Sequence, residues 1–277
     1  MNRILVPLDF TDNSLHALGY AQQLAKKLDA RVHLMYAWHP TLYPTDAAGA
    51  LPVTYTENTG RVQLQAFARE YGIPESDTTL AIGFPAERIV EASKQPGVDL
   101  IVMGSRERDP DLADRLIGTI ATEVCEEARC PVLVVPQGVA FGRGFDHILY
   151  ASSRDATDES TVMRVIDLAR RFRADVHFVH VQVDDDADDI AEAIAVEDTL
   201  FEELLRDDDT GVRVQLVTIE DDSVVEGLTQ YAAENNIDLM VSVTRRRSWW
   251  QELFHVSQTK KLTLYADLPL LVLHLDD

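Results

Sequence analysis

The chain has 277 residues, of which 46% are hydrophobic, so it is long enough for two ordinary domains, each with its own core. No apolar run reaches the roughly 18 residues of a membrane span, and Met1-Asn2-Arg3 leads directly into an apolar segment, so we expect no membrane span, no signal peptide and a cytoplasmic location. The net charge of −22 argues against binding to nucleic acid or to an anionic membrane, and the scarcity of lysine beside aspartate is typical of a halophile.

Strands and helices alternate along the first half of the chain. Apolar runs predict strands over residues 3–8, 31–37, 78–82, 98–104 and 130–136. Helical spacing predicts helices over residues 15–28, 61–71, 88–94 and 118–128, with Thr11, Asp12 or Ser14 as the cap of the first. This alternation is typical of an α/β fold with a parallel sheet and helices on both faces.

The second half repeats the first. The segment ILVPLDF at Ile4 corresponds to ILYASSR at Ile148, and VDLIVMGSR at Val98 corresponds to IDLMVSVTR at Ile237. Because the same order of segments returns, we expect two copies of one α/β unit. The expected limits are domain 1 over residues 1–137, a glycine-rich linker over 138–146 and domain 2 over 147–277.

Polar and glycine residues follow two of the predicted strands of the first copy. Asp9 follows the first strand, and Gly104 ends the strand before the helix that starts at Gly118-Thr119. Ligands of such sheets bind beyond the carboxyl ends of the strands, and glycines at a helix start let phosphate approach the backbone N–H groups. Two other interpretations stay open: a tight strand exit with an ordinary helix cap, and an Asp9 that only binds loop amides.

The second copy differs at these positions. Ser153 replaces Asp9, Val243 replaces Gly104, Val256 replaces Gly118, and Ser257 replaces Thr119. Its strands are kept while the glycines are lost, so we expect a degenerate site in domain 2.

The order of these motifs resembles the tandem form of the universal stress protein family. The segments that carry the resemblance are Ile4 to Asp9, Gly83-x-Pro85-Ala86-Glu87, Val98 to Ser105, Gly118-Thr119 and Cys130 to Val135. The resemblance implies two doubly wound domains of the adenine nucleotide alpha hydrolase-like type, each with an open five-stranded parallel sheet. It also implies that the two domains pair through their last strands within the chain, and it leaves room for a homodimer.

Some members of that family bind ATP, so the resemblance implies an ATP site with magnesium in domain 1. Glu107 stands where the family's ATP-binding pattern has its middle glycine. There is no Walker lysine and no base to position water, so we expect no catalytic residue and at most weak ATP hydrolysis. The positions that we assign to the nucleotide site are Asp9, Ala37, Met103, Gly104, Arg106, Gly118, Thr119 and Ile120.

A rival hypothesis is a protein–protein interaction module that binds no nucleotide. The segment Arg245 to Trp250 would contact an unknown protein partner, because Arg and Trp are preferred at interface hot spots. Its arginines could also hold an anion together with Ser257 and Lys260, or pair with acidic residues of the same chain. A nucleotide-transfer enzyme on a related fold is less favoured, since a lysine and a second substrate signature are missing.

The cysteines and histidines indicate no metal site. Cys125 and Cys130 fit neither a disulfide framework nor a zinc site, and we expect both to be buried. His33 and His177 occupy corresponding strand positions in the two copies, which favours packing in or near the core. No histidine pair has the spacing of helix-borne metal ligands.

Overall fold

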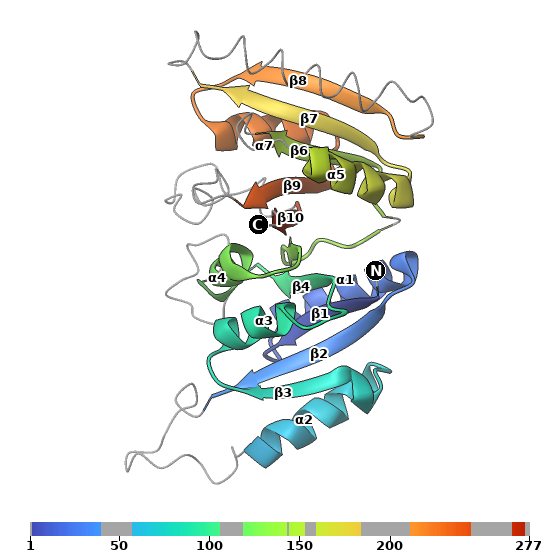
Figure 1. The fold of residues 1–277 in the computed structure, drawn as a ribbon, viewed down its shortest axis with the longest axis vertical. Helices are drawn as coiled ribbons and strands as arrows, with labels where there is room; N and C mark the ends of the chain where they lie inside the picture. The colour runs from blue at the N-terminus through green and yellow to red at the C-terminus, as the bar shows by residue number, and fades with distance from the viewer. Residues whose placement is uncertain are drawn as a thin grey trace. The chain divides into compact units, whose positions relative to one another are not determined.

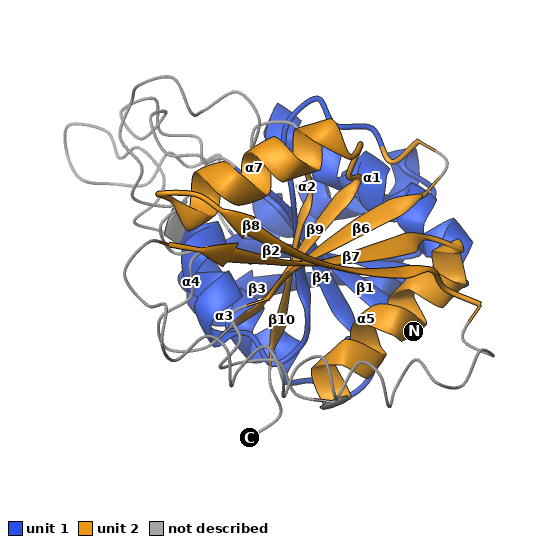
Figure 2. Ribbon diagram, turned by 90° about the horizontal axis from the view of Figure 1, so that it is seen from above, with its two compact units in different colours: residues 1–113, 117–140 blue, residues 114–116, 141–277 orange. Residues whose placement is uncertain are grey.

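The computed structural model describes residues 2–39, 57–105, 119–142, 144–152, 159–183, 211–244 and 268–274. The described residues fall into two compact units, the first ending at Ala140 and the second beginning at Phe141 (Figure 2). The described part of the chain contains no helix that is both long and apolar enough to cross a membrane.

The first unit is an open sheet of five parallel strands in the order β3-β2-β1-β4-β5 (Figure 1). The strands are β1 (Arg3–Leu8), β2 (Arg31–Trp38), β3 (Thr78–Ile82), β4 (Leu100–Gly104) and β5 (Val132–Val135). The helices are α1 (Asp12–Leu28), α2 (Glu57–Glu70), α3 (Pro85–Ser93) and α4 (Thr119–Glu127), and a 3-10 turn, η2 (Glu75–Asp77), precedes β3.

Side-chain alternation along β2 assigns helices α2 and α3 to opposite faces of the first sheet. Tyr36 of β2 contacts Phe10, which in turn contacts Phe67 of α2, so α2 covers the face that carries Tyr36. His33 and Met35 point to the opposite face, which carries α3. Most residues of β1, β4 and β5 are buried, which explains the almost continuous apolar sequences of these strands.

The second unit repeats this topology, with the strand order β10-β9-β6-β7-β8 and parallel pairing throughout. Its strands are β6 (His147–Ser152), β7 (Asp175–Gln182), β8 (Val214–Glu220), β9 (Leu239–Thr244) and β10 (Leu270–His274). Its described helices are α5 (Glu159–Phe172) and α7 (Val224–Glu234). The expected α/β class and the five-stranded parallel sheet are thus confirmed for each unit, whereas the pairing of the domains and their limits stay predictions.

A repeated hydrogen bond fixes the correspondence between the units. Asp99 accepts hydrogen bonds from the backbone N–H groups of Asn2 and Arg3, just before and at the start of β1. Asp238 accepts them from Asp146 and His147 at the start of β6, at 2.8 and 2.9 Å. Each carboxylate precedes the strand that pairs with the first strand of its unit, so the two units can be compared residue by residue.

Candidate functional site

The strand order places a topological switch between β1 and β4 in the first unit. From β1 the chain continues to β2 and β3 on one side, whereas β4 and β5 lie on the other side. Asp9 and Gly104 stand at the carboxyl ends of these two adjacent strands. This is the place where open parallel sheets bind ligands, because the connections diverge there and leave a crevice.

Asp9 is exposed and anchors the loop that leads into α1. Its Oδ1 accepts hydrogen bonds from the backbone N–H of Thr11 at 3.0 Å and from the Thr11 hydroxyl at 2.5 Å. Thr11 in turn caps α1 by accepting from the N–H of Ser14 at 3.3 Å. Asp9 therefore binds the amide and the hydroxyl of the loop residue Thr11, which is the loop-binding role that the sequence offered as one alternative.

Phe10 turns this loop in a conformation that is unusual for its residue type. Its φ of 62° lies in the left-handed region, which costs free energy for a residue with a bulky side chain. The ring is held by edge-on contacts with Tyr36 at 4.8 Å and Phe67 at 5.5 Å between centroids. These contacts stabilise the turn and direct Phe10 into the core while Asp9 stays at the surface.

Gly104 packs directly beneath the side chain of Asn13, from the first turn of α1. A Cβ at position 104 would lie 2.6 Å from Oδ1 of Asn13 and closer still to its amide nitrogen, so no larger residue fits without movement. The packing of Asn13 therefore explains why position 104 is a glycine, whether or not Gly104 also contacts a ligand. Sequence reasoning missed Asn13, although the repeat carries a signal: where Val243 replaces Gly104, Thr157 replaces Asn13.

The other predicted site residues are only partly described. Ala37 is half-buried near the carboxyl end of β2, which is adjacent to β1, and Met103 is buried in β4. Thr119 is the first residue of α4, and the half-buried Ile120 follows it. Several predicted positions lie outside the described residues, namely Arg106, Glu107, Gly118, Ser153, Arg245 to Trp250, Val256, Ser257 and Lys260.

The cysteines are buried and free, as the sequence predicts. Burial raises the pKa of Cys130 to about 12, with the charge of Asp99 adding to the shift, and it raises the pKa of Cys125 further. His177 is 3% exposed, and His33 is half-buried, which confirms packing in and near the core. Within the described ranges, no group of three or more His, Cys, Asp or Glu side chains could hold a metal ion.

The two units repeat one doubly wound parallel sheet, and the first has an acidic residue and a glycine at its switch point. These features define a tandem α/β protein. The model of the universal stress protein family matches residues 1–136 and 144–274, so the chain belongs to this family and carries its domain twice.

Relatives and solved structures agree with this assignment. A universal stress protein of Methanocaldococcus jannaschii is 33% identical over 139 residues, which cover 48% of this chain and 81% of the relative. A universal stress protein structure from Archaeoglobus fulgidus has the same tandem fold, with a TM-score of 0.69, 18% identity and coverage of 99% of this chain and 96% of that chain. A universal stress protein solved in complex with cAMP matches 48% of this chain and 96% of its own, at 23% identity and a TM-score of 0.36, a level that does not transfer its ligand.

Proposed function

We propose that the first unit binds an adenine nucleotide, ATP with magnesium, at the carboxyl ends of β1 and β4, and that this protein acts in stress tolerance through the occupancy of that site. The observation that carries the proposal is the placement of Asp9 and Gly104 at adjacent strand ends across the topological switch. The start of α1 and the start of α4 follow these two strands. Helix starts offer N–H groups to phosphate, and Asp9 offers a carboxylate to a sugar hydroxyl.

The sequence of the first unit argues for binding rather than turnover. It offers no lysine in a phosphate-binding loop and no base that would position water. Occupancy can still act as a signal, because a ligand shifts a conformational equilibrium by its difference in affinity for the two states. Glu107 would repel phosphate, whereas Arg106 could offset that repulsion by binding it.

The test is a calorimetric titration of the whole chain with MgATP, at about 0.1 M and about 2 M KCl because screening reduces repulsion between the acidic protein and the nucleotide. We expect saturable heat with a dissociation constant below about 1 mM. The matched variants copy the second unit into the first: Asp9→Ser, and Asn13→Thr combined with Gly104→Val. Both variants should weaken the binding of MgATP by about tenfold or more. Asp9→Ser loses a charge-assisted hydrogen bond, and the double variant prevents the close approach of the ligand to the backbone.

The charge of Asp9 makes the experiment with Asp9→Ser more discriminating. Removing a negative charge anywhere should favour an anionic ligand slightly, so a loss of affinity in Asp9→Ser runs against the general trend. Asp167→Ser, which removes an exposed carboxylate from α5, is the charge-matched control and should keep or slightly improve binding. No heat up to about 1 mM MgATP at either salt concentration, or equal affinity of wild type and Asp9→Ser, would overturn the proposal.

A further inference from the structure

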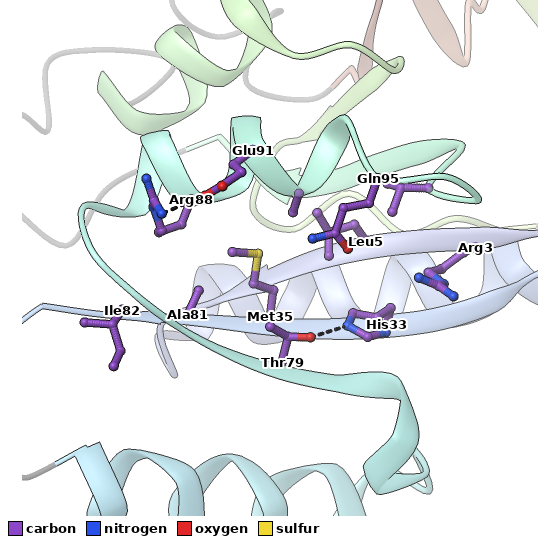
Figure 3. A pocket seen from close by; sticks show the side chains of 12 residues that line it. Arg3, Leu5, His33, Met35, Thr79, Ala81, Ile82, Arg88, Glu91 and Gln95 are labelled. Carbon is purple, nitrogen blue, oxygen red and sulfur yellow. Dashed lines mark hydrogen bonds and ion pairs between the residues drawn. The ribbon is translucent and has the colours of Figure 1, made fainter.

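A cavity of about 200 Å³ lies between α3 and one face of the first sheet (Figure 3). Neither Asp9 nor Gly104 lines this cavity, which extends along the strands to Arg3 at the start of β1. Arg3, His33 and Gln95 gather at one end of the cavity, and Ile82 and Arg88 at the other. Its floor and wall between these ends are mainly apolar, formed by Leu5, Met35, Ala81, Ala92 and Val98.

Three buried nitrogens around this cavity have no hydrogen-bond partner: Nε of Arg3, Nδ1 of His33 and Nε of Arg88. Buried polar nitrogens are nearly always hydrogen-bonded in proteins, so three unpartnered nitrogens at one cavity point to a ligand that would supply their partners. Arg88 is already neutralised by Glu91, at 2.6 Å. Within the described part of the chain no carboxylate lies within ion-pair distance of the Arg3 guanidinium, so Arg3 is the uncompensated cation of the cavity.

The second unit fills the corresponding space with its own side chain. His177 of β7 corresponds to His33, since each pairs with the third residue of the first strand of its unit. Tyr231 of α7 corresponds to Ala92, because each precedes the matching Asp238 or Asp99 by seven residues. The hydroxyl of Tyr231 lies 2.8 Å from Nδ1 of His177, so an aromatic ring with a polar end occupies the site in that unit.

The polar end of the site differs between the units. Arg3 stands where the second unit has His147, whose ring lies 5.6 Å from that of His177. Thr79, whose hydroxyl lies 2.8 Å from Nε2 of His33, stands where the second unit has Val217. The first unit therefore has an open space where the second unit has the neutral ring of Tyr231. At the edge of that space it has the guanidinium of Arg3 and the hydroxyl of Thr79.

We infer that this cavity binds a small aromatic carboxylate, with the ring in the space left by Ala92 and the carboxylate on Arg3 and His33. The guanidinium fork matches a carboxylate in a two-pronged geometry, which a compact cation would not do. The volume favours a ligand of this size, because pockets for drug-sized molecules measure roughly 300–1,000 Å³. A nucleotide is too large for the cavity, so this site is independent of the one proposed at the strand ends.

The test uses 4-fluorobenzoate as the probe, followed by ¹⁹F NMR with the whole chain, and 4-fluorophenol as its uncharged counterpart. Wild type should bind 4-fluorobenzoate saturably, with a dissociation constant below about 10 mM. Ala92→Tyr copies the second unit and should abolish binding, while Arg3→Gln should weaken 4-fluorobenzoate at least about tenfold and leave 4-fluorophenol nearly unchanged. Asp9→Ser should leave 4-fluorophenol unchanged and should not weaken 4-fluorobenzoate, which separates this result from the loss of affinity expected in the nucleotide experiment.

A complementary experiment creates the corresponding cavity in the second unit. Tyr231→Ala should create an equivalent cavity, and added phenol should raise the melting temperature of that variant more than that of wild type. If Ala92→Tyr folds poorly, Ala92→Leu takes its place as the variant with a filled cavity. Its binding of the two probes is then compared with that of Arg3→Gln. Saturable binding that persists in both filled variants, no saturation in wild type, or equal affinity of wild type and Arg3→Gln for 4-fluorobenzoate would overturn the inference.

Discussion

The hydroxyl of Tyr231 lies 2.8 Å from Nδ1 of His177, and the two rings meet edge to face with centroids 5.8 Å apart. Tyr231 thereby links α7 to β7 through one hydrogen bond and one aromatic contact. We expect Tyr231→Phe to lower the free energy of unfolding by about 1–3 kcal/mol, because it leaves a buried imidazole nitrogen without its partner. Tyr231→Ala should cost about 2–4 kcal/mol, since the half-buried ring is lost as well.

Urea denaturation followed by circular dichroism measures both variants of Tyr231. Exposed Gln230, the preceding residue on α7, gives the matched control: Gln230→Ala should change stability by less than about 0.5 kcal/mol. Equal stabilities of Tyr231→Phe and wild type would show that the hydrogen bond contributes nothing net.

The contact between Gly104 and Asn13 predicts that these two positions change together. Gly104→Val alone should destabilise the first unit by about 1–3 kcal/mol, because the new side chain would overlap Asn13. Asn13→Thr in the same chain should recover part of that loss, as in the pair Thr157 and Val243 of the second unit. A double-mutant cycle in urea measures the coupling, and additive effects of the two substitutions would contradict the direct contact.

The two strand histidines predict a loss of stability toward acid pH. Burial lowers the pKa of His33, with a further contribution from the charge of Arg3, and burial lowers the pKa of His177, with a further contribution from His147. Above about pH 6.5 both histidines are neutral in the folded and unfolded chain, so their contribution to stability is complete. As the pH falls below that value, the unfolded chain binds protons that the folded chain does not, and stability decreases.

NMR titration of the two imidazole rings checks this prediction. Both midpoints should lie below about 6.5, and His177→Gln should flatten the loss of stability between about pH 7 and pH 5. A midpoint at or above the ordinary value for either ring would show that burial does not control its protonation.

The cysteines should be inert in the folded protein. Burial raises the pKa of the Cys130 thiol to about 12, so at pH 8 only about one molecule in ten thousand carries the reactive thiolate. Cys125 is fully covered in α4 and has an even higher pKa. A thiol reagent such as DTNB should therefore label neither residue in the native protein at pH 8 and both in urea; fast labelling of the native protein would contradict the packing.

The sequence predicted strands better than helix starts. The limits of β1 and β3 were predicted correctly, because polar residues or turns bound their apolar or extended runs. Helix α3 begins at Pro85 rather than Arg88, since proline fits the first helical turn, where its missing N–H is not needed. Helix α2 begins at Glu57 rather than Arg61, and the ion pair between these two residues, at 2.9 Å, stabilises the added turn.

The candidate sites were predicted only in part, because periodicity identifies the buried face of an element and not the side chain that crosses to a neighbour. Asp9 and Gly104 could be placed at strand ends from their positions after apolar runs. The packing of Asn13 on Gly104 and the cavity beside Ala92 depend on residues that are distant in the chain. Only the comparison of the two copies, with Thr157 and Tyr231 at the matching positions, carries a signal for them.

The hydrogen bonds to Asp99 have a consequence for folding kinetics. They join residues that are 97 and 96 positions apart, and β1 must lie between β2 and β4 before the centre of the first sheet is complete. Such a high contact order slows folding, because the chain entropy of a long loop is lost before the contact stabilises the structure. On the ribosome, β1 must therefore wait for β4 to emerge, and the second unit repeats that delay through Asp238.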